Sequence, residues 1–371
     1  MRILLLSANT GGGHNSAAAA VKAAFEQKDV ECVLKDTLAF ISEIHSDIIS
    51  SGHSYIYRHL PQLFGAGYRF EEKHTPKFIY EQMSWGAKSL ASYLREESFD
   101  AIISTHIFGS MMVTEARKTY GVTLPHYVVV TDYAVYPGTD MLDVKRYFIA
   151  SEEMADAYRN AGVEEERLCP SGIPIHPNFL CKRTKQEARM KLHLPTAGKV
   201  VLLFSGSIGC GNLNRIAPEL EKQLPEHCTL VIICGHNARL YRQLKEVVSP
   251  QTVIVGYTTR IADYMAASDL CISKPGGLST TEMLVSQLPA VLMLSVPGCE
   301  TRNLEFFTER SAAVGTDEWD EALRMTGFLL RNPDKLVEIK ENLKKIDYPG
   351  GTSVIVNTVL SDIGCSSLSM E

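Results

Sequence analysis

Two glycine-rich segments carry side chains that can do chemistry, and the first lies near the start of the chain. His14 directly follows the run Gly11–Gly13, and we expect it at the amino end of a helix. The helix dipole disfavours imidazolium, so His14 should be neutral and able to accept a proton near pH 7. Asp132 and His106 follow later strands, and Asp132 can orient this imidazole or replace it as the base. The competing interpretations are a structural turn with a surface histidine and, for Asp132, a helix or turn cap.

The glycines of this first segment predict an anion site. Glycine adopts positive φ and lets backbone amides approach a ligand closely, and we expect Asn15 or Ser16 to cap the helix that follows. Amides at a helix start attract anionic groups, so Gly13 is a candidate contact for a diphosphate. A dinucleotide loop with Asp36 on a ribose is the rival interpretation, but the spacing G-x-G-x-x-G is absent.

The second segment reads S-K-P-G-G-L-S-T-T-E at 273–282 and follows a predicted strand. Gly277, Ser279 and Thr280 stand at a helix start, where amides and hydroxyls suit a diphosphate. Glu282 lies in the first turn, where its carboxylate can accept hydrogen bonds from a diol such as ribose. Helix capping alone would also explain these residue types.

Two more polar loops follow strands in the same half of the chain. In P-G-C-E-T-R-N, Glu300 and Asn303 are three residues apart and share a helix face, where a carboxylate and an amide can bind sugar hydroxyls. Ser207 lies in a serine- and glycine-rich loop and is a candidate for the phosphates. Three polar loops at successive strand ends favour a phosphate and sugar site more than any one of them does.

The elements that must position these residues alternate between apolar runs and helical patterns, which predicts an α/β fold with parallel sheets covered on both faces. The predicted strands are Arg2–Ala8, Glu31–Lys35, Ala101–Thr105, Tyr127–Thr131, Tyr147–Ala150, Lys199–Ser205, Thr229–Gly235, Val253–Gly256, Leu270–Ser273 and Ala290–Ser295. The predicted helices include Ser16–Gln27, Gly109–Tyr120, Leu213–Leu224, Ala238–Val248, Thr280–Gln287 and Glu300–Arg310.

The alternation runs through two series with a Pro/Gly-rich stretch and a basic stretch between them. We therefore predict two doubly wound, Rossmann-like domains, residues 1–174 and 175–350, that face each other across a cleft. Residues 351–371 are expected to form a helix or tail that can pack back on the first domain. Both glycine-rich segments stand at carboxyl ends of strands, where ligands of such sheets bind.

Composition excludes several classes of protein. The 371 residues are 45% hydrophobic and 22% charged, as in globular proteins, and a net charge of −6 argues against a bulk nucleic-acid binder. Nine cysteines without a C-x-x-C pair favour reduced thiols in the cytosol over a disulfide framework. No apolar stretch approaches the roughly 20 residues of a transmembrane helix, and no histidine and cysteine spacing predicts a metal site.

One segment, Ser51–Arg95, combines nine aromatic residues with six basic and three acidic residues. Such a surface suits anionic lipid headgroups, so we predict peripheral membrane binding. The alternative is a pair of core-facing helices with solvated basic side chains. The candidate membrane or acceptor contacts are Tyr57, Arg58, Phe64, Tyr68, Arg69 and Trp85.

Four motifs occur in a fixed order: G-G-G-H-x-S-A near the start, G-Y-T-x-R-I-x-D-Y-M-x-x-S-D at 256–269, K-P-G-G-L-S-T-T-E at 274–282 and P-G-x-E-x-x-N at 297–303. Over most of the chain they resemble the glycolipid synthases of glycosyltransferase family 28, which include monogalactosyldiacylglycerol synthases and bacterial processive diacylglycerol β-glucosyltransferases. The resemblance implies a GT-B fold, a UDP-sugar donor held by the second domain, inversion at the anomeric carbon and a diacylglycerol-type acceptor.

The resemblance also implies roles for individual residues. It places Tyr257 and Thr258 near uracil, mainly through backbone, and Glu300 and Asn303 on the transferred sugar. The residues of segment 273–282 named above would cradle the diphosphate and the ribose. His14 would face the acceptor hydroxyl as the base.

Two residues depart from the pattern of the family. Cys299 stands where the family usually has glutamine, which bears on the identity of the sugar. Tyr136 stands where the family often has histidine after the T-D pair, which bears on the acceptor site.

The expected reaction is a single displacement in which the acceptor hydroxyl attacks C1 of glucose or galactose and UDP leaves. It needs a base and positive potential, but no cofactor, metal or enzyme nucleophile, because the UDP-sugar is a co-substrate. The product would be a β-linked glycolipid, made by a cytoplasmic protein bound at the inner face of the membrane. The alternatives are a UDP-GlcNAc transferase acting on a polyprenyl-linked cell-wall precursor, a UDP-sugar epimerase of the same fold and a non-catalytic UDP-sugar sensor.

Overall fold

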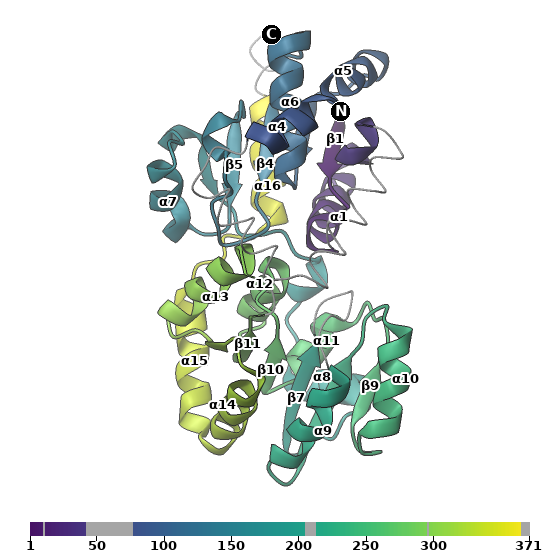
Figure 1. Cartoon of the computed structure of the whole chain (residues 1–371), viewed down its shortest axis with the longest axis vertical. Coiled ribbons are helices and arrows are strands. Elements are labelled where there is room, and N and C mark those ends of the chain that lie inside the picture. The colour runs from purple at the N-terminus through teal and green to yellow at the C-terminus, as the bar shows by residue number, and fades with distance from the viewer. Residues whose placement is uncertain (10–11, 42–76, 205–212, 295–296, 365–371) are drawn as a thin grey trace. The chain divides into compact units, whose positions relative to one another are not determined.

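The computed structural model describes residues 1–9, 12–41, 77–204, 213–294 and 297–364. It divides into two compact units: unit 1 comprises Met1–His176 with Asp347–Glu371, and unit 2 comprises Pro177–Ile346. The chain therefore passes from one unit to the other twice, and its last helix belongs to unit 1. Each unit is built on a parallel sheet with helices on both of its faces (Figure 1).

The sheet of unit 1 has the strand order β2-β1-β3-β4-β5-β6. Its strands are β1 (Arg2–Ser7), β2 (Glu31–Asp36), β3 (Ala101–Ser104), β4 (His126–Val129), β5 (Arg146–Ile149) and β6 (Leu168–Pro170). Its α-helices in the described part are α1 (Gly12–Glu26), α4 (Lys77–Ser84), α5 (Ala87–Glu96), α6 (Ile107–Tyr120), α7 (Ala155–Asn160) and α16 (Thr352–Gly364). Strand order reverses between β1 and β3, so the carboxyl ends of these strands form a topological switch point, the usual place of a ligand.

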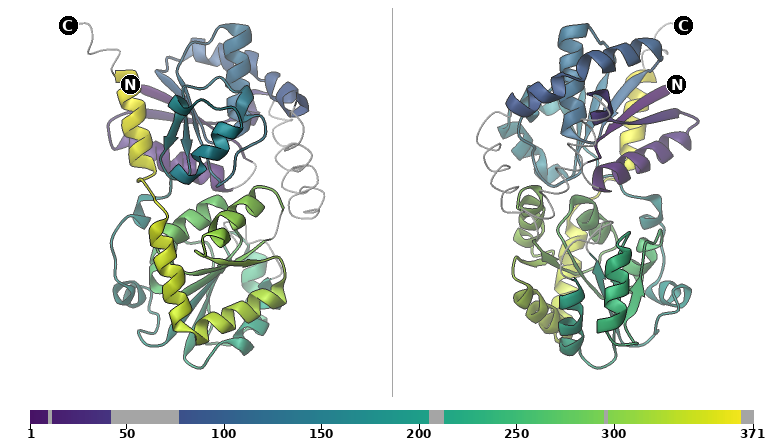
Figure 2. Two further views of the ribbon diagram at one scale, coloured as in Figure 1. Left: turned by 90° about the vertical axis from the view of Figure 1, so that its left-hand side faces the viewer. Right: turned by 45° about the vertical axis from the view of Figure 1, so that its right-hand side comes forward.

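Alternation along β1 builds both faces of this sheet, because successive side chains of a strand point to opposite sides. Ile3 and Leu5 pack with Phe25 of α1 and with residues of α16 on one face. Leu4 and Leu6 pack with residues of α5 and α6 on the other. Burying each such side chain contributes about 1.5–3 kcal/mol. Figure 2 shows α16 lying along this sheet beside α1.

Helix α16 is also tied to the sheet by charge. Asp362 accepts hydrogen bonds from Arg146 Nε at 2.7 Å and from Arg146 Nη2 at 2.8 Å, and Lys145 Nζ lies 3.7 Å away. A bidentate pair of planar groups is stronger and more directional than a single contact. The C-terminal helix therefore completes the core of unit 1, although unit 2 precedes it in the chain.

The sheet of unit 2 has the strand order β12-β11-β10-β7-β8-β9, in which order reverses between β7 and β10. Its strands are β7 (Lys199–Phe204), β8 (Cys228–Ile233), β9 (Val253–Val255), β10 (Leu270–Ser273), β11 (Ala290–Met293) and β12 (Val314–Thr316). Its described α-helices are α8 (Lys185–Lys191), α9 (Leu213–Gln223), α10 (Ala238–Val247), α11 (Ile261–Ala267), α12 (Gly277–Val285), α13 (Cys299–Glu309), α14 (Trp319–Arg331) and α15 (Pro333–Lys345).

The strands agree closely with the sequence pattern. Every predicted strand is present, and its ends shift by at most two residues. The prediction missed β6 and β12, the three-residue strands at one edge of each sheet, whose residues are all half-buried. The equally short edge strand β9 was predicted because it reads V-I-V, whereas β6 reads L-C-P and β12 reads V-G-T. Proline and glycine are depleted in strands, so these two segments carry no strand signal.

The start of α1 corrects two expectations. The helix begins at Gly12 rather than Ser16, so neither Asn15 nor Ser16 is its cap, and Gly12 and Gly13 do not adopt positive φ. Glycine tolerates helical φ as readily as positive φ, and the alanines that follow favour helix. Asn15 instead bonds to the preceding strand, since Ser7 Oγ donates to Asn15 Oδ1 at 2.6 Å.

Candidate active site

His14 lies in the first turn of α1, at the switch point of unit 1, and two neighbouring strand ends hold its imidazole. Its Nδ1 is 2.9 Å from the carbonyl oxygen of Thr105, which follows β3. The same nitrogen is 2.8 Å from Oγ1 of Thr131, which follows β4. Thr105 Oγ1 in turn donates to the His14 carbonyl at 3.2 Å. The ring is therefore fixed by groups that are distant in sequence.

The contact with Thr105 decides which nitrogen of His14 can act as a base. A backbone carbonyl only accepts, so Nδ1 carries the proton and Nε2 of the neutral ring has a free electron pair. Burial lowers the pKa of His14, partly opposed by the charge of Asp132 and by the Thr105 carbonyl. The imidazole is therefore neutral at pH 7, with Nε2 ready to take a proton.

Asp132 and His106 lie close to this ring in different ways. Asp132 accepts a hydrogen bond from Tyr136 Oη, and that oxygen lies 3.2 Å from Thr131 Oγ1. The His106 ring packs edge-on against His14, with 4.4 Å between the ring centroids. His106 also caps α6, since its Nδ1 accepts from Phe108 N at 3.1 Å. The structure thus brings both candidates beside His14. It adds Thr131, whose part in the site the sequence did not indicate, and Tyr136, which the sequence marked only as a departure from the family pattern.

In unit 2, α12 begins at Gly277 directly after the switch-point strand β10, three residues before the predicted start. The first amides of a helix have no partner within the helix, so those of Gly277 and Ser279 suit an anion. Thr280 is already used by the helix: its Oγ1 donates to the carbonyls of Gly276 and Gly277, both at 3.0 Å, and its amide donates to Gly276. Thr280 therefore holds the loop in shape through its own hydrogen bonds.

Because α12 begins at Gly277, Glu282 occupies its second turn rather than the predicted first turn, and it is half-buried. Burial raises the pKa of Glu282 to about 8. The carboxyl is thus mostly protonated at pH 7 in the absence of a partner. Two hydroxyls of a diol would favour its ionised form, because hydrogen bonds to a charged acceptor are the stronger ones.

Glu300 and Asn303 lie on α13, and both contact the segment before α12. Lys274 Nζ lies 2.6 Å from Glu300 Oε1. Asn303 is fully buried, and its Nδ2 donates to the Pro275 carbonyl at 2.9 Å. This hydrogen bond fixes the backbone that leads into Gly276. The two residues therefore couple the α12 start to α13, and their contact with a sugar stays a prediction.

Tyr257 follows β9 and offers an exposed aromatic face. Its side chain is 59% exposed, and its ring stacks on His236, with 4.0 Å between centroids and 20° between the planes. His236 follows β8, the neighbouring strand, so the pair stands at the same edge of the sheet as α12. Planar stacked rings of this kind suit a nucleobase. The sequence did not single out His236, since its pairing with Tyr257 depends on strand order.

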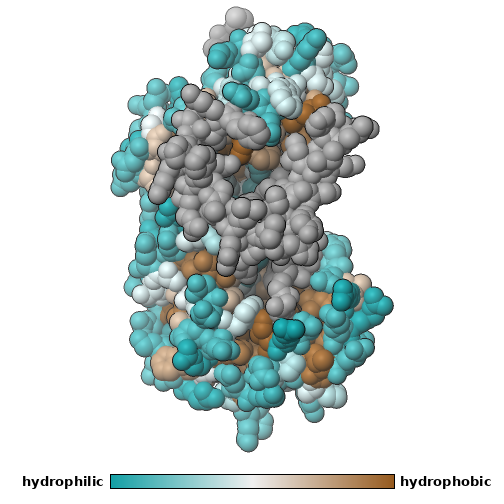
Figure 3. Space-filling model, viewed as in Figure 1, coloured by the Kyte–Doolittle hydropathy of each residue, from teal (hydrophilic) through white to brown (hydrophobic). Residues whose placement is uncertain are grey.

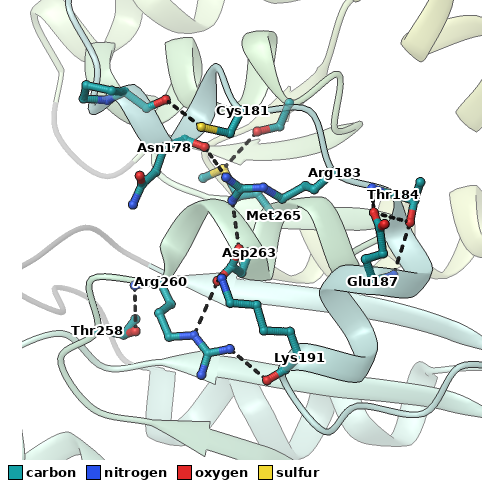
Figure 4. A network of polar contacts seen from close by, with 12 residues as sticks. Asn178, Cys181, Arg183, Thr184, Glu187, Lys191, Thr258, Arg260, Asp263 and Met265 are labelled. Atoms are coloured by element: carbon teal, nitrogen blue, oxygen red, sulfur yellow. Dashed lines mark hydrogen bonds and ion pairs between the residues drawn. The ribbon is translucent and has the colours of Figure 1, made fainter.

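A charge network holds α11 and the loop that carries Thr258 (Figure 4). Asp263 lies 2.9 Å from Arg183 Nη1 and 2.8 Å from Lys191 Nζ. Arg260 Nε lies 3.4 Å from the same carboxylate, and Arg260 N donates to Thr258 Oγ1 at 3.0 Å. Burial acts to raise the pKa of Asp263, but the bonds from Lys191 and Arg260 outweigh it and the pKa falls. The motif residues Arg260 and Asp263 thus fasten α8 to α11.

Several predicted contacts lie outside the described residues: Ser207, Tyr57, Arg58, Phe64, Tyr68 and Arg69. Of the remaining candidates, Gly13 lies in the first turn of α1, and Trp85 is 65% exposed between α4 and α5. Tyr93, also in the aromatic segment, packs instead between Phe40 and Phe99, with centroids 5.6 and 5.8 Å away.

The surface and the helices of the described residues are relevant to the predicted membrane binding. The view in Figure 3 is mostly hydrophilic, with small apolar patches among the described residues. Among the helices in the described ranges, none is both long and apolar enough to cross a bilayer. The same ranges contain no group of three histidine, cysteine, aspartate or glutamate side chains placed to hold a metal ion.

Solved structures share this fold. MurG of Acinetobacter baumannii gives a TM-score of 0.65 at 16% identity, over 97% of this chain and 99% of that one. The glycotransferase of kitacinnamycin gives 0.63 at 14% identity, over 98% and 99%. UDP-GlcNAc 2-epimerase from Neisseria meningitidis gives 0.60 at 12% identity, over 97% and 100%. The fold is therefore GT-B, as predicted, and by itself it does not separate a transferase from an epimerase.

Sequence comparisons narrow the class of protein within this fold. Residues 14–175 match the family model of monogalactosyldiacylglycerol (MGDG) synthase, and residues 200–302 match the glycosyltransferase family 28 C-terminal domain. Proteins named processive diacylglycerol β-glucosyltransferase from Bacillus cereus (strain B4264) and Bacillus mycoides (strain KBAB4) are 29% identical, covering 97% of this chain and 94% of each relative. The protein is a glycosyltransferase. It belongs to the glycolipid synthases of glycosyltransferase family 28, as the motifs predicted.

Proposed function

We propose that this protein transfers a hexose, glucose or galactose, from a UDP-sugar to diacylglycerol or a glycosyl-diacylglycerol. The transfer inverts the anomeric carbon and yields a β-linked membrane glycolipid. The observation that carries the proposal is His14, held through Nδ1 so that Nε2 is a free base at the switch point of unit 1. The relatives that match along the whole chain carry the name of this activity.

In the proposed reaction His14 Nε2 takes the proton of the acceptor hydroxyl as its oxygen forms a bond to C1 of the sugar. The bond from C1 to the diphosphate oxygen breaks, and its electron pair leaves with UDP. Asp132 stabilises the imidazolium that results. General base catalysis of this kind contributes about 10²–10⁴ in rate.

The donor contacts we propose lie in unit 2, with Gly13 of α1 as one more candidate for the diphosphate. The amides of Gly277 and Ser279 receive the diphosphate, and Glu282 receives the ribose hydroxyls. The exposed ring of Tyr257, beside Thr258, offers a surface for uracil. Solved GT-B proteins with UDP-glucose or UDP bound share this fold at 15% and 14% identity.

The donor contacts to the sugar itself follow from α13. Glu300 and Asn303 stand beside the start of α12, so a sugar attached to a diphosphate there would meet them. Thr280 supports this loop through its own hydrogen bonds rather than through a free hydroxyl. We assign the choice between glucose and galactose to the residues at the start of α12 and on α13.

We further propose that the protein works in the cytoplasm, bound peripherally to the inner face of an anionic membrane. The exposed Trp85 supports this, because an aromatic side chain at a surface suits the bilayer interface. The test is sedimentation with vesicles of phosphatidylcholine alone or mixed with phosphatidylglycerol. Binding that grows with the anionic lipid supports the proposal, and a protein that stays in the supernatant contradicts it.

The decisive experiment incubates the full chain with UDP-glucose or UDP-galactose and diacylglycerol in mixed micelles. We expect a glycosyl-diacylglycerol by mass spectrometry and a β-anomer by NMR. A product with the α-configuration would overturn the single displacement. Conversion of the sugar nucleotide without any acceptor would indicate an epimerase, and nucleotide binding without turnover would indicate a sensor.

A further inference from the structure

A continuous row of polar groups connects His14 to Asp132 in unit 1. His14 Nδ1 lies 2.8 Å from Thr131 Oγ1, and Thr131 Oγ1 lies 3.2 Å from Tyr136 Oη. Tyr136 Oη donates to Asp132 Oδ2. The carboxylate therefore reaches the histidine ring through two hydroxyls.

The two ends of the row decide the direction of every hydrogen bond in it. The Thr105 carbonyl can only accept, so His14 Nδ1 bears the proton, and Thr131 Oγ1 must accept from it. The carboxylate of Asp132 can only accept, so Tyr136 donates to it. The hydroxyl proton of Thr131 is then directed to Tyr136 Oη. All the donors point one way, from the imidazole to the carboxylate.

Rigid neighbours hold the middle of this row. Thr131 is buried and follows the end of β4 in the chain. The Tyr136 carbonyl accepts from Thr139 Oγ1 at 2.6 Å and from Thr139 N at 3.2 Å. Tyr147 of β5 donates to the Thr139 carbonyl at 2.7 Å. The backbone of Tyr136 is thus tied to the sheet through Thr139, and its hydroxyl is held by Thr131 and Asp132.

We propose that Thr131 and Tyr136 are positioning residues that couple Asp132 to the catalytic His14. The inference rests on the proposed function, in which Nε2 takes the acceptor proton. When that proton arrives, the imidazolium donates more strongly from Nδ1 to Thr131, and each hydroxyl polarises the next toward the carboxylate. No proton moves along the row: Nδ1 keeps its hydrogen and Asp132 keeps its charge. The row holds the reactive tautomer and stabilises the positive ring.

Three titratable groups lie around the His14 ring: Asp132, His106 and Tyr136. Asp132, after β4, raises the pKa of His14, whereas burial lowers it more strongly. His106, at the start of α6, packs edge-on against the ring, and its own Nδ1 accepts a hydrogen bond from Phe108 N. The Tyr136 hydroxyl contacts Thr131, which in turn contacts the ring. Removing that hydroxyl cuts the row while leaving both Asp132 and His106 in place.

The test compares Tyr136→Phe with the parent chain in transfer from UDP-glucose to diacylglycerol. We expect kcat to fall about 10-fold, as for one hydrogen bond in a row that ends on a charge, while KM for UDP-glucose stays within about twofold. The acid limb of the kcat/KM profile moves to lower pH, because Asp132 then supports the imidazolium less. Thr131→Val does the same, Thr131→Ser restores most of kcat, and the double variant is no worse than the poorer single one.

The matched control is Tyr80→Phe. Tyr80 also donates to a carboxylate of unit 1, Glu115, at 3.2 Å, but it lies on α4 and Glu115 on α6. This variant should keep the kcat and the acid limb of the parent chain. Equal effects of Tyr80→Phe and Tyr136→Phe, or additive effects of Thr131→Val and Tyr136→Phe, would overturn the inference. So would an unchanged kcat and acid limb in Tyr136→Phe.

A second readout needs no turnover. NMR of the chain labelled with ¹⁵N-histidine, with His14 assigned by its loss in His14→Gln, reports the tautomer and the pKa of this ring. We expect Nδ1–H in the parent chain and a lower pKa in Tyr136→Phe. If NMR shows this change but no sugar is transferred, the proposed function fails and the row stands. If sugar is transferred and NMR shows no change, the row fails alone.

Discussion

The two units place a candidate site at the same kind of position but build it from different groups. In unit 1 the site after β1 and β3 centres on one side chain, His14, whose Nδ1 contacts the Thr105 carbonyl and the Thr131 hydroxyl. In unit 2 the site after β10 consists mainly of backbone, the amides at the start of α12. A base needs one nitrogen with a defined proton, whereas a diphosphate needs several donors around it. The same topology therefore serves two chemistries.

The comparison predicts that changes in unit 1 act on turnover and changes in unit 2 act on nucleotide binding. The largest effect belongs to His14→Ala, which should lower kcat by about 10²–10⁴ because it removes the base. Affinity for UDP, measured by calorimetry, should stay as in the parent chain. His193→Asn is the control, an exposed histidine of unit 2 at φ 55, where asparagine is also tolerated. Loss of UDP affinity in His14→Ala would break the separation between the units.

The pH profile of the parent chain sharpens the same comparison. Burial lowers the pKa of His14 below its ordinary value of 6.5, so the base is deprotonated at neutral pH. The kcat/KM profile should therefore rise with pH on an acid limb centred below pH 6.5 and then level off. An acid limb above that value would mean that the ring is charged in the free protein.

Glu282→Gln should have a smaller effect than His14→Ala. It should raise stability at high pH and weaken nucleotide binding. The pKa of Glu282 is raised from 4.5 to about 8, so its contribution to the free energy of unfolding is present below pH 4.5 and lost as the pH rises to about 8. At pH 8.5 the variant should be more stable than the parent by roughly 1–3 kcal/mol, since it removes a half-buried charge. At pH 4.5 the two should melt alike.

Nucleotide affinity should change the other way in the same variant. If ribose hydroxyls bind the ionised carboxylate, the affinity of the parent chain for UDP rises with pH up to about 8, and binding releases protons at pH 7. Calorimetry in buffers of different ionisation enthalpy measures that release. Glu282→Gln should bind more weakly and without pH dependence. A pH-independent affinity in the parent chain would remove Glu282 from the site.

A loss of stability of similar size is expected for Asn303→Ala, with a smaller effect on turnover. The change leaves the Pro275 carbonyl without the buried amide that now donates to it, which costs about 1–3 kcal/mol of stability. Because the loop before α12 loosens, KM for the UDP-sugar should rise while kcat changes less. Thermal melting and steady-state kinetics check both effects. A variant that melts like the parent chain would show that this hydrogen bond does not fix the loop.

Much of the fold could be predicted from sequence because buried parallel strands are continuous apolar runs. Leu270–Ser273 was predicted to the residue, and the glycine-rich segment after it lies at the switch point. The predicted start of α1 was wrong. A glycine run is compatible with both a turn and a helix, and only the packed chain decides between them. The edge strands β6 and β12 were missed because each contains a proline or a glycine, which sequence patterns associate with turns.

The sequence by itself determined the alternation of elements, the residue types at the strand ends and the family of the chain. Only the tertiary structure decided how those residues meet. Thr105 and Thr131 are 91 and 117 positions from His14, and they reach it because β3 and β4 follow β1 in the sheet. The shift of Glu282 likewise comes from burial, which no local pattern records. Local periodicity determines elements, whereas hydrogen-bond partners and pKa values depend on the order in which the strands assemble.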